Sequence, residues 1–225
     1  MKENIKVVIF DADYTLYTPD ADKGYEAKFK FLERETGIPS EKIRRVWKEV
    51  LEEVKNSKDP QKRRRTYSTR RALEKFGIEN SEELAKKSVD VFLDEVVRSM
   101  ETMKGAEEIL ERLNTKYDLV VASDEFKGNL KKKLNSFLGD WKDYFQAMIT
   151  PETTGEMKPS KRYYEAVHEE LGYDYKEMIM VGDSWRRDLE PTKKGMETVL
   201  INESCEGNPD YHIKELGELR DILGA

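Results

Sequence analysis

The stretch that decides the fold is Ile5-Lys6-Val7-Val8-Ile9-Phe10-Asp11-Ala12-Asp13. Residues 5–10 are almost all apolar and rich in β-branched side chains, a composition typical of a buried strand in a parallel sheet. The apolar run stops abruptly at Asp11, and a second aspartate follows at Asp13. The sequence therefore predicts a buried strand followed by a polar loop that carries two carboxylates.

A long helical segment follows this strand. From residue 18 to residue 102, apolar residues recur at helical spacing, and the stripe around Trp47 is expected to pack inside this segment. Breaks at Gly37, Asp59-Pro60 and Gly77 indicate about four helices. The last of them is expected to begin with a capping box formed by Asn80 and Glu83. No strand pattern is found between residues 18 and 102.

After residue 105, helices and strands alternate. Strands are expected at 119–122, 147–150, 178–181, 198–201 and 211–213, and one of the intervening helices is expected from Asp188 to Lys194. Such alternation is typical of a mostly parallel sheet with helices on both faces. We therefore expect an α/β fold with a Rossmann-like core, residues 1–17 and 103–225, and an inserted α-helical cap domain, residues 18–102.

The composition argues against two classes of partner. The chain has 40 Lys and Arg residues against 46 Asp and Glu, and its isoelectric point is near 5.3, so no overall positive field favours nucleic acid. No stretch approaches the roughly 18 uncharged apolar residues of a membrane span, and the N-terminus lacks the apolar region of a secretory signal. We therefore expect a cytoplasmic protein that binds neither nucleic acid nor membrane.

The residues best suited to chemistry follow the predicted strands. Asp11 and Asp13 follow the first strand, Ser123 the second and Lys158 the third, while Asp183 and Asp188 follow the fourth. Ligands of doubly wound sheets bind beyond these carboxyl ends. Converging carboxylates repel one another unless a divalent cation lies between them, and oxygen ligands without His or Cys favour Mg²⁺ over zinc. A serine hydroxyl and a fixed lysine add a site for a second anion, which phosphate fits best.

The same residues form four motifs in a fixed order. They are Asp11-Ala12-Asp13-Tyr14-Thr15-Leu16, Ser123 after Val120-Val121-Ala122, Lys158-Pro159, and Gly182-Asp183-Ser184 with Asp188. One such motif is weak by itself, whereas four in this order, each at a strand end, are highly specific. Over essentially its whole length the chain resembles the haloacid dehalogenase superfamily, in the branch whose helical cap lies between the first two motifs.

The resemblance implies a role for each of these residues. Asp11 would be the nucleophile that forms an aspartyl-phosphate, and Asp13 would be the general acid and base. The carboxylates of Asp11 and Asp183 and the backbone carbonyl of Asp13 would hold Mg²⁺. The phosphoryl group would be held by the Ser123 hydroxyl, the Asp124 N–H and Lys158. Asp188 would orient Lys158 or a metal-bound water, although an aspartate that opens a helix is also a common N-cap.

Several positions depart from the pattern of the family, among them Tyr14 and Asp124. Tyr14 stands where the family most often has glycine, which would shape the entrance to the site. Asp124 stands where asparagine is common, so only its backbone N–H is assigned to phosphate.

The resemblance implies a Mg²⁺-dependent phosphatase that acts on a small phosphorylated metabolite through an aspartyl-phosphate. A phosphomutase of the same superfamily is the nearest alternative, because it carries the same four motifs. A non-catalytic module that binds phosphate is a third possibility from a different class. Dehalogenation is disfavoured, because dehalogenases need no Mg²⁺ and lack the carboxylate that Asp13 supplies.

Overall fold

The computed structural model describes residues 4–57, 59–190, 192 and 195–224, and it divides the chain into two compact units. One unit comprises Met1–Thr18 and Glu101–Ala225, and the other comprises Pro19–Met100. Two short strands, β2 (Tyr17–Thr18) and β3 (Glu101–Thr102), pair antiparallel where the chain leaves the first unit and where it returns to it. The expectation of no strand between residues 18 and 102 is wrong at these ends, where pairing of two remote segments creates a ribbon too short to leave a pattern.

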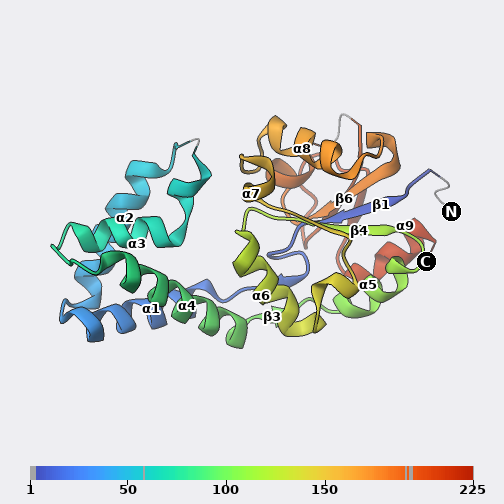
Figure 1. Cartoon of the computed structure of the whole chain (residues 1–225). Coiled ribbons are helices and arrows are strands. Elements are labelled where there is room, and N and C mark those ends of the chain that lie inside the picture. Colours follow the sequence, from blue (N-terminus) through green and yellow to red (C-terminus); the bar gives the residue numbers. More distant parts are fainter. Residues whose placement is uncertain (1–3, 58, 191, 193–194, 225) are drawn as a thin grey trace. The chain divides into compact units, whose positions relative to one another are not determined.

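The first unit is built on a six-stranded sheet (Figure 1). Its strands are β1 (Val7–Phe10), β4 (Asp118–Ala122), β5 (Ala147–Ile149), β6 (Met178–Gly182), β7 (Glu197–Ile201) and β8 (Tyr211–Ile213). They lie in the order β5-β4-β1-β6-β7-β8, and each neighbouring pair is parallel. The prediction of an α/β fold with a mostly parallel sheet is confirmed.

Helices cover both faces of this sheet. They are α5 (Ala106–Asn114), α6 (Lys127–Leu138), α7 (Pro151–Thr154), α8 (Lys161–Leu171) and α9 (Leu219–Leu223). Short helical turns supplement them at η2 (Trp141–Asp143), η3 (Tyr175–Glu177), η4 (Trp185–Leu189) and η5 (Leu216–Glu218). Figure 1 shows α8 on one face and α5 and α9 on the other. The two central strands, β1 and β6, are apolar and buried along their whole length because helices cover both faces of the sheet.

The strand order reverses at β1, and this reversal positions the site. From β1 the chain passes to β4 and β5 on one side, and then returns to β6 on the other side. Phe10 is in register with Val121 of β4 and Val181 of β6, so the three strands end at the same level. A parallel sheet forms its ligand crevice at such a switch point, because the connections diverge there.

The second unit is helical. It contains α1 (Ala21–Thr36), α2 (Ser40–Val54), η1 (Pro60–Arg63), α3 (Arg65–Glu74) and α4 (Ser81–Ser99). Trp47 is buried in the shared core as expected, and its indole N–H donates to the Ser68 hydroxyl at 2.9 Å. The expected capping box at Asn80 is wrong: α4 does begin after Asn80, but that side chain makes no capping hydrogen bond. No helix among the described residues is long and apolar enough to cross a membrane.

The helical unit buries one lysine in an aromatic setting. Lys28 of α1 is 0% exposed, and its ammonium lies 4.5 Å from the ring centroid of Trp47 and 5.0 Å from that of Phe29. Within the described part of the chain, this ammonium has no hydrogen-bond partner. Burial, together with the positive charges of Arg65 and Arg44, lowers the pKa of Lys28 well below 10.5.

We expect the substitution Lys28→Met to raise the melting temperature at pH 7. Methionine has a similar volume and carries no charge to desolvate, and replacing a buried charge by an apolar side chain is often stabilising by about 1 kcal/mol or more. Because the pKa of Lys28 is lower in the folded state, the wild type should gain stability as the pH rises toward 10.5, whereas the variant lacks this gain.

Thermal unfolding of both proteins at pH 7 and pH 10 measures this difference. Lys30→Met, an exposed change on the same helix, is the control. A lower melting temperature in Lys28→Met than in Lys30→Met at pH 7 would contradict the prediction.

Candidate active site

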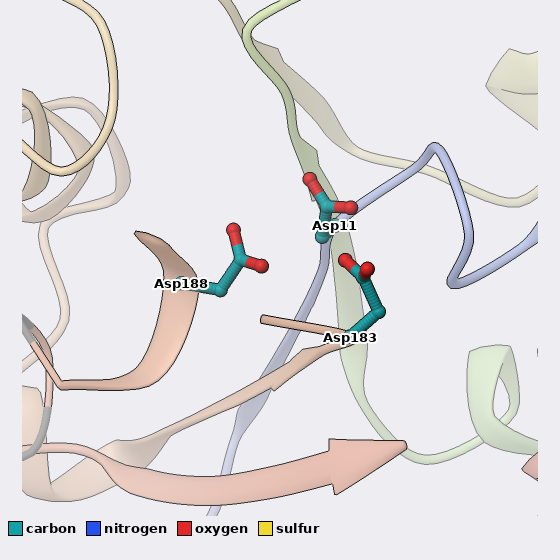
Figure 2. A group of neighbouring side chains, drawn as sticks. All are labelled: Asp11, Asp183 and Asp188. Atoms are coloured by element: carbon teal, nitrogen blue, oxygen red, sulfur yellow. The ribbon is translucent and has the colours of Figure 1, made fainter. Parts of the chain in front are cut away.

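Three aspartates meet at the carboxyl ends of β1 and β6. Asp11 directly follows β1 and Asp183 directly follows β6, which are neighbouring strands in register, and Asp188 comes from η4. One carboxylate oxygen of each residue lies within 4.8 Å of the other two (Figure 2). Figure 2 shows the carboxylates pointing toward one another from these three segments. Three converging carboxylate oxygens match the ligand chemistry of Mg²⁺.

Asp188 reaches this cluster through an unusual turn. We expected a helix to begin at Asp188, but the π-helical turn η4 begins at Trp185 and ends at Leu189, so Asp188 does not open a helix and the N-cap interpretation is wrong. Its Oδ2 accepts a hydrogen bond from the Ser184 N–H at 3.2 Å. Pro191, Lys193 and Lys194 of the expected helix lie outside the described residues. π-Helical turns are rare in proteins, and those that occur are often found at functional sites.

Lys158 is the cation of the cluster. Its side chain is 1% exposed, and its ammonium donates to Asp11 Oδ1 at 2.6 Å and to Asp188 Oδ1 at 2.8 Å. One ammonium fixed between two carboxylates orients both of them. The observed contact with Asp188 supports the expected role of that residue in orienting Lys158.

Negative charge exceeds positive charge in this cluster. Burial, aided by the charges of Asp188 and Asp183 and opposed by Lys158, raises the pKa of Asp11 to about 8. Burial and the charge of Asp188 also raise the pKa of Asp183 to about 6. A divalent cation would offset this repulsion, so the residues present fit Mg²⁺ in both ligand type and charge.

Ser123 and Asp124 lie at the end of β4, next to β1 in the sheet. Ser123 is 4% exposed, and its hydroxyl accepts a hydrogen bond from the Glu125 N–H at 3.1 Å. The side chain of Asp124, to which we assigned no role, accepts a hydrogen bond from the backbone N–H of Lys158 at 2.8 Å. It also forms an ion pair with Arg187. Asp124 therefore also fixes the backbone that carries Lys158.

Asp13 lies outside the three-carboxylate cluster and pairs with a different lysine. Its Oδ1 and Oδ2 accept hydrogen bonds from the Lys133 ammonium at 3.0 and 3.1 Å. Lys133 was not expected at the site, because it follows Lys131 and Lys132 and the run resembles a solvated helix face. The signal was its spacing from Leu130 and Leu134, which places it on the buried stripe of α6.

Tyr14 adopts a conformation that explains the glycine usual at this position. Its φ is +64°, in the left-handed region where a side chain is disfavoured and glycine is not. The side chain is 51% exposed, so it extends outward from the loop between Asp13 and Thr15.

Gly182 makes room for Asp188. A Cβ atom at Gly182 would lie 2.7 Å from the Cβ and 3.0 Å from the Cγ of Asp188, closer than such atoms approach in proteins. Gly182→Ala should therefore displace Asp188 and weaken Mg²⁺ binding by about 10- to 100-fold.

Calorimetric titration with Mg²⁺ measures the effect of this change. Gly128→Ala is a matched control, because nothing lies within 4 Å of the position where its Cβ would be built. Wild-type affinity in Gly182→Ala would show that the position of Asp188 does not matter to the metal.

Comparison with known proteins gives the family. A model described as haloacid dehalogenase-like hydrolase matches residues 5–194. The relative named "Putative HAD-hydrolase YfnB" from Bacillus subtilis is 25% identical over 158 residues, which are 67% of this chain and 65% of that protein, so the match spans just under two thirds of this curated relative. The solved structure of that protein bound to magnesium is 22% identical to this chain, with a TM-score of 0.69. The match covers 99% of this chain and 100% of that one.

Two other solved structures carry different activities in their names. A HAD phosphatase from Thermococcus onnurineus is 26% identical with a TM-score of 0.68, and a 2-haloacid dehalogenase from Pseudomonas syringae is 23% identical with a TM-score of 0.78. Each match covers 98% of both chains. The family match over most of the chain agrees with the observed sheet and confirms the resemblance. The chain belongs to the haloacid dehalogenase-like hydrolases and is therefore an enzyme.

Proposed function

We propose that the protein is a Mg²⁺-dependent phosphatase that hydrolyses a small phosphorylated metabolite through an aspartyl-phosphate on Asp11. The observation that carries the proposal is the Asp11 carboxylate, which contacts the buried ammonium of Lys158 at 2.6 Å within a cluster of three carboxylates. A carboxylate nucleophile needs a cationic setting that lowers its repulsion with a phosphate dianion, and this cluster supplies one fixed cation and ligands for another.

Two displacements at phosphorus complete the proposed reaction. An oxygen of Asp11 attacks phosphorus, the bond from phosphorus to the leaving oxygen breaks, and Asp13 gives its proton to that oxygen. Water then attacks the phosphorus of the aspartyl-phosphate while Asp13 accepts its proton. The bond from phosphorus to Asp11 breaks, inorganic phosphate leaves, and both aspartates return to their starting states.

Other residues would hold the phosphoryl group during both displacements. Ser123, the Asp124 N–H and Lys158 would donate to its oxygens, and the ion pair with Asp188 would keep Lys158 in place. The carboxylates of Asp11 and Asp183 and the carbonyl of Asp13 would hold Mg²⁺, which neutralises charge on the phosphate when bound. The helical unit, residues 19–100, would act as a cap that selects the substrate.

Release of inorganic phosphate tests the proposal. We expect hydrolysis of p-nitrophenyl phosphate, and of members of a panel of phosphorylated metabolites, with Mg²⁺ but not with EDTA. Asp183→Asn should lose this activity, whereas the control Asp221→Asn, an exposed aspartate of α9, should keep it. Isomerisation of a sugar phosphate without free phosphate would indicate a phosphomutase. Halide release from 2-chloropropionate in EDTA, without phosphatase activity, would indicate a dehalogenase.

A further inference from the structure

Helix α6 directs a lysine inward. Four of its residues are buried, Leu130, Lys133, Leu134 and Leu138, and the side chain of Lys133 is only 2% exposed. Its ammonium lies 3.0 and 3.1 Å from the two carboxylate oxygens of Asp13 and 3.2 Å from Glu125 Oε2. A lysine ammonium has three donors, and three carboxylate oxygens surround this one. Burying the charge of the Lys133 ammonium is tolerated because these carboxylates pair with it.

Glu125 fixes the other end of this arrangement. Its side chain is 5% exposed, and its Oε1 accepts hydrogen bonds from the Phe126 N–H at 3.1 Å and from Asn129 Nδ2 at 3.0 Å. Because these donors belong to the start of α6, the helix itself fixes Glu125. The ammonium of Lys133 therefore bridges a carboxylate held by the helix and a carboxylate on the loop after β1.

The loop that carries Asp13 needs such support. Asp13 is half-buried, with its side chain 33% exposed, and the residue after it has left-handed backbone. A carboxylate with this exposure can rotate about its side-chain torsions unless a partner binds it. The ammonium engages both oxygens at once, and each oxygen retains a second lone pair for proton transfer. Both bonds together restrict the carboxylate to one orientation.

We propose that Lys133 is a positioning residue that holds the Asp13 carboxylate in the orientation from which it protonates the leaving oxygen. This inference rests on the proposed function, in which Asp13 is the general acid. Proton transfer is sensitive to alignment, and a small displacement of a catalytic group has a large effect on rate. Among the described residues, Lys133 makes no hydrogen bond or ion pair with Asp11, Asp183 or Lys158; its carboxylate partners are Asp13 and Glu125.

The leaving group reveals whether Lys133 acts through Asp13. We would measure kcat/KM, which reports formation of the aspartyl-phosphate when that step is irreversible, on p-nitrophenyl phosphate and on an alkyl phosphate such as glycerol 2-phosphate. Nitrophenolate leaves without a proton, whereas an alkoxide needs one. Lys133→Met should lower kcat/KM for the alkyl ester by about 100-fold and for the aryl ester by less than about 5-fold. A purely structural lysine would affect both esters equally.

Three further variants complete the design. Lys131→Met changes an exposed lysine of the same helix and should match the wild type on both esters. Lys133→Met leaves Glu125 buried without its cation, so Lys133→Met with Glu125→Gln removes both charges and keeps the measurement possible if the single variant unfolds. In an Asp13→Asn background, Lys133→Met should cause no further selective loss on the alkyl ester.

The outcomes separate the inference from the function on which it rests. A selective loss on the alkyl ester in Lys133→Met, or in Lys133→Met with Glu125→Gln, supports the inference. Equal losses on the two esters, with an active wild type and an inactive Asp11→Asn, would overturn the inference alone. No phosphate release from the wild type would overturn the proposed function and the inference with it.

Discussion

Asp11→Asn is expected to reduce phosphate release by about 10⁴-fold or more while the protein stays folded. An amide cannot attack phosphorus to form the aspartyl-phosphate, so neither displacement can begin. Its oxygen can still accept the hydrogen bond from Lys158, which the wild-type carboxylate accepts at 2.6 Å. Initial rates of phosphate release from p-nitrophenyl phosphate with Mg²⁺, compared with Asp221→Asn, measure the loss. Equal rates in Asp11→Asn and the wild type would show that Asp11 is not the nucleophile.

The same variant should be more stable than the wild type at pH 8 in EDTA. Asp11 has a pKa of about 8 in the folded protein against 3.8 as the reference value, so the folded state holds the proton more tightly. Its contribution to stability is therefore fully present below pH 3.8 and is lost as the pH rises toward 8. Asparagine does not ionise and escapes this loss. Melting temperatures at pH 5 and pH 8 measure the difference, which should be larger at pH 8. A less stable variant at pH 8 would contradict this explanation.

Lys158→Met is expected to lower both activity and stability. The variant leaves Asp11 and Asp188 without the cation that lies 2.6 and 2.8 Å from them, and breaking a buried pair by removing one partner costs about 3 to 5 kcal/mol. Phosphate release should fall by about 10²- to 10³-fold, the usual loss for one charged donor that contacts a reacting group. Urea unfolding and steady-state rates measure the two effects.

Adding Mg²⁺ distinguishes the contribution of Lys158 to stability from its contribution to the rate. The cation should restore part of the stability of Lys158→Met, because it also neutralises the carboxylates, but it should not restore the rate. Lys161→Met, three residues further along with a side chain that is 91% exposed, is the matched control. Unchanged stability in Lys158→Met would mean that the three carboxylates tolerate one another without this lysine.

The framework of the site could be predicted because it depends on strand ends. A strand buried on both faces needs a continuous apolar run, so the end of the run marks the first residue of the loop. Asp11, Ser123 and Asp183 were found in this way, and the parallel sheet then brings them to one edge. Predicting these positions required only the local composition and the rule that ligands bind beyond the carboxyl ends of parallel strands.

The contacts of Lys133 and of the Asp124 side chain were not predicted, because they depend on how separate elements pack. Lys133 belongs to a run of three lysines; its spacing from Leu130 and Leu134 places it on the buried stripe of α6, but its carboxylate partner Asp13 comes from a remote loop. The Asp124 side chain gained a role through Arg187, which is remote in sequence and arrives with the η4 turn. In both cases the partner is supplied by another element of the fold.

The sequence by itself determined the α/β class, the six strands and the chemical types present at their carboxyl ends. Periodicity and the order of motifs carry this information, because both are properties of neighbouring residues. Only the tertiary structure decided that Asp188 joins Asp11 and Asp183, since its approach depends on the π-helical turn and on the absent side chain of Gly182. It also decided that Lys158 and Lys133 each serve a different aspartate of the first motif. Charge–charge contacts between remote segments depend on packing, which local sequence does not encode.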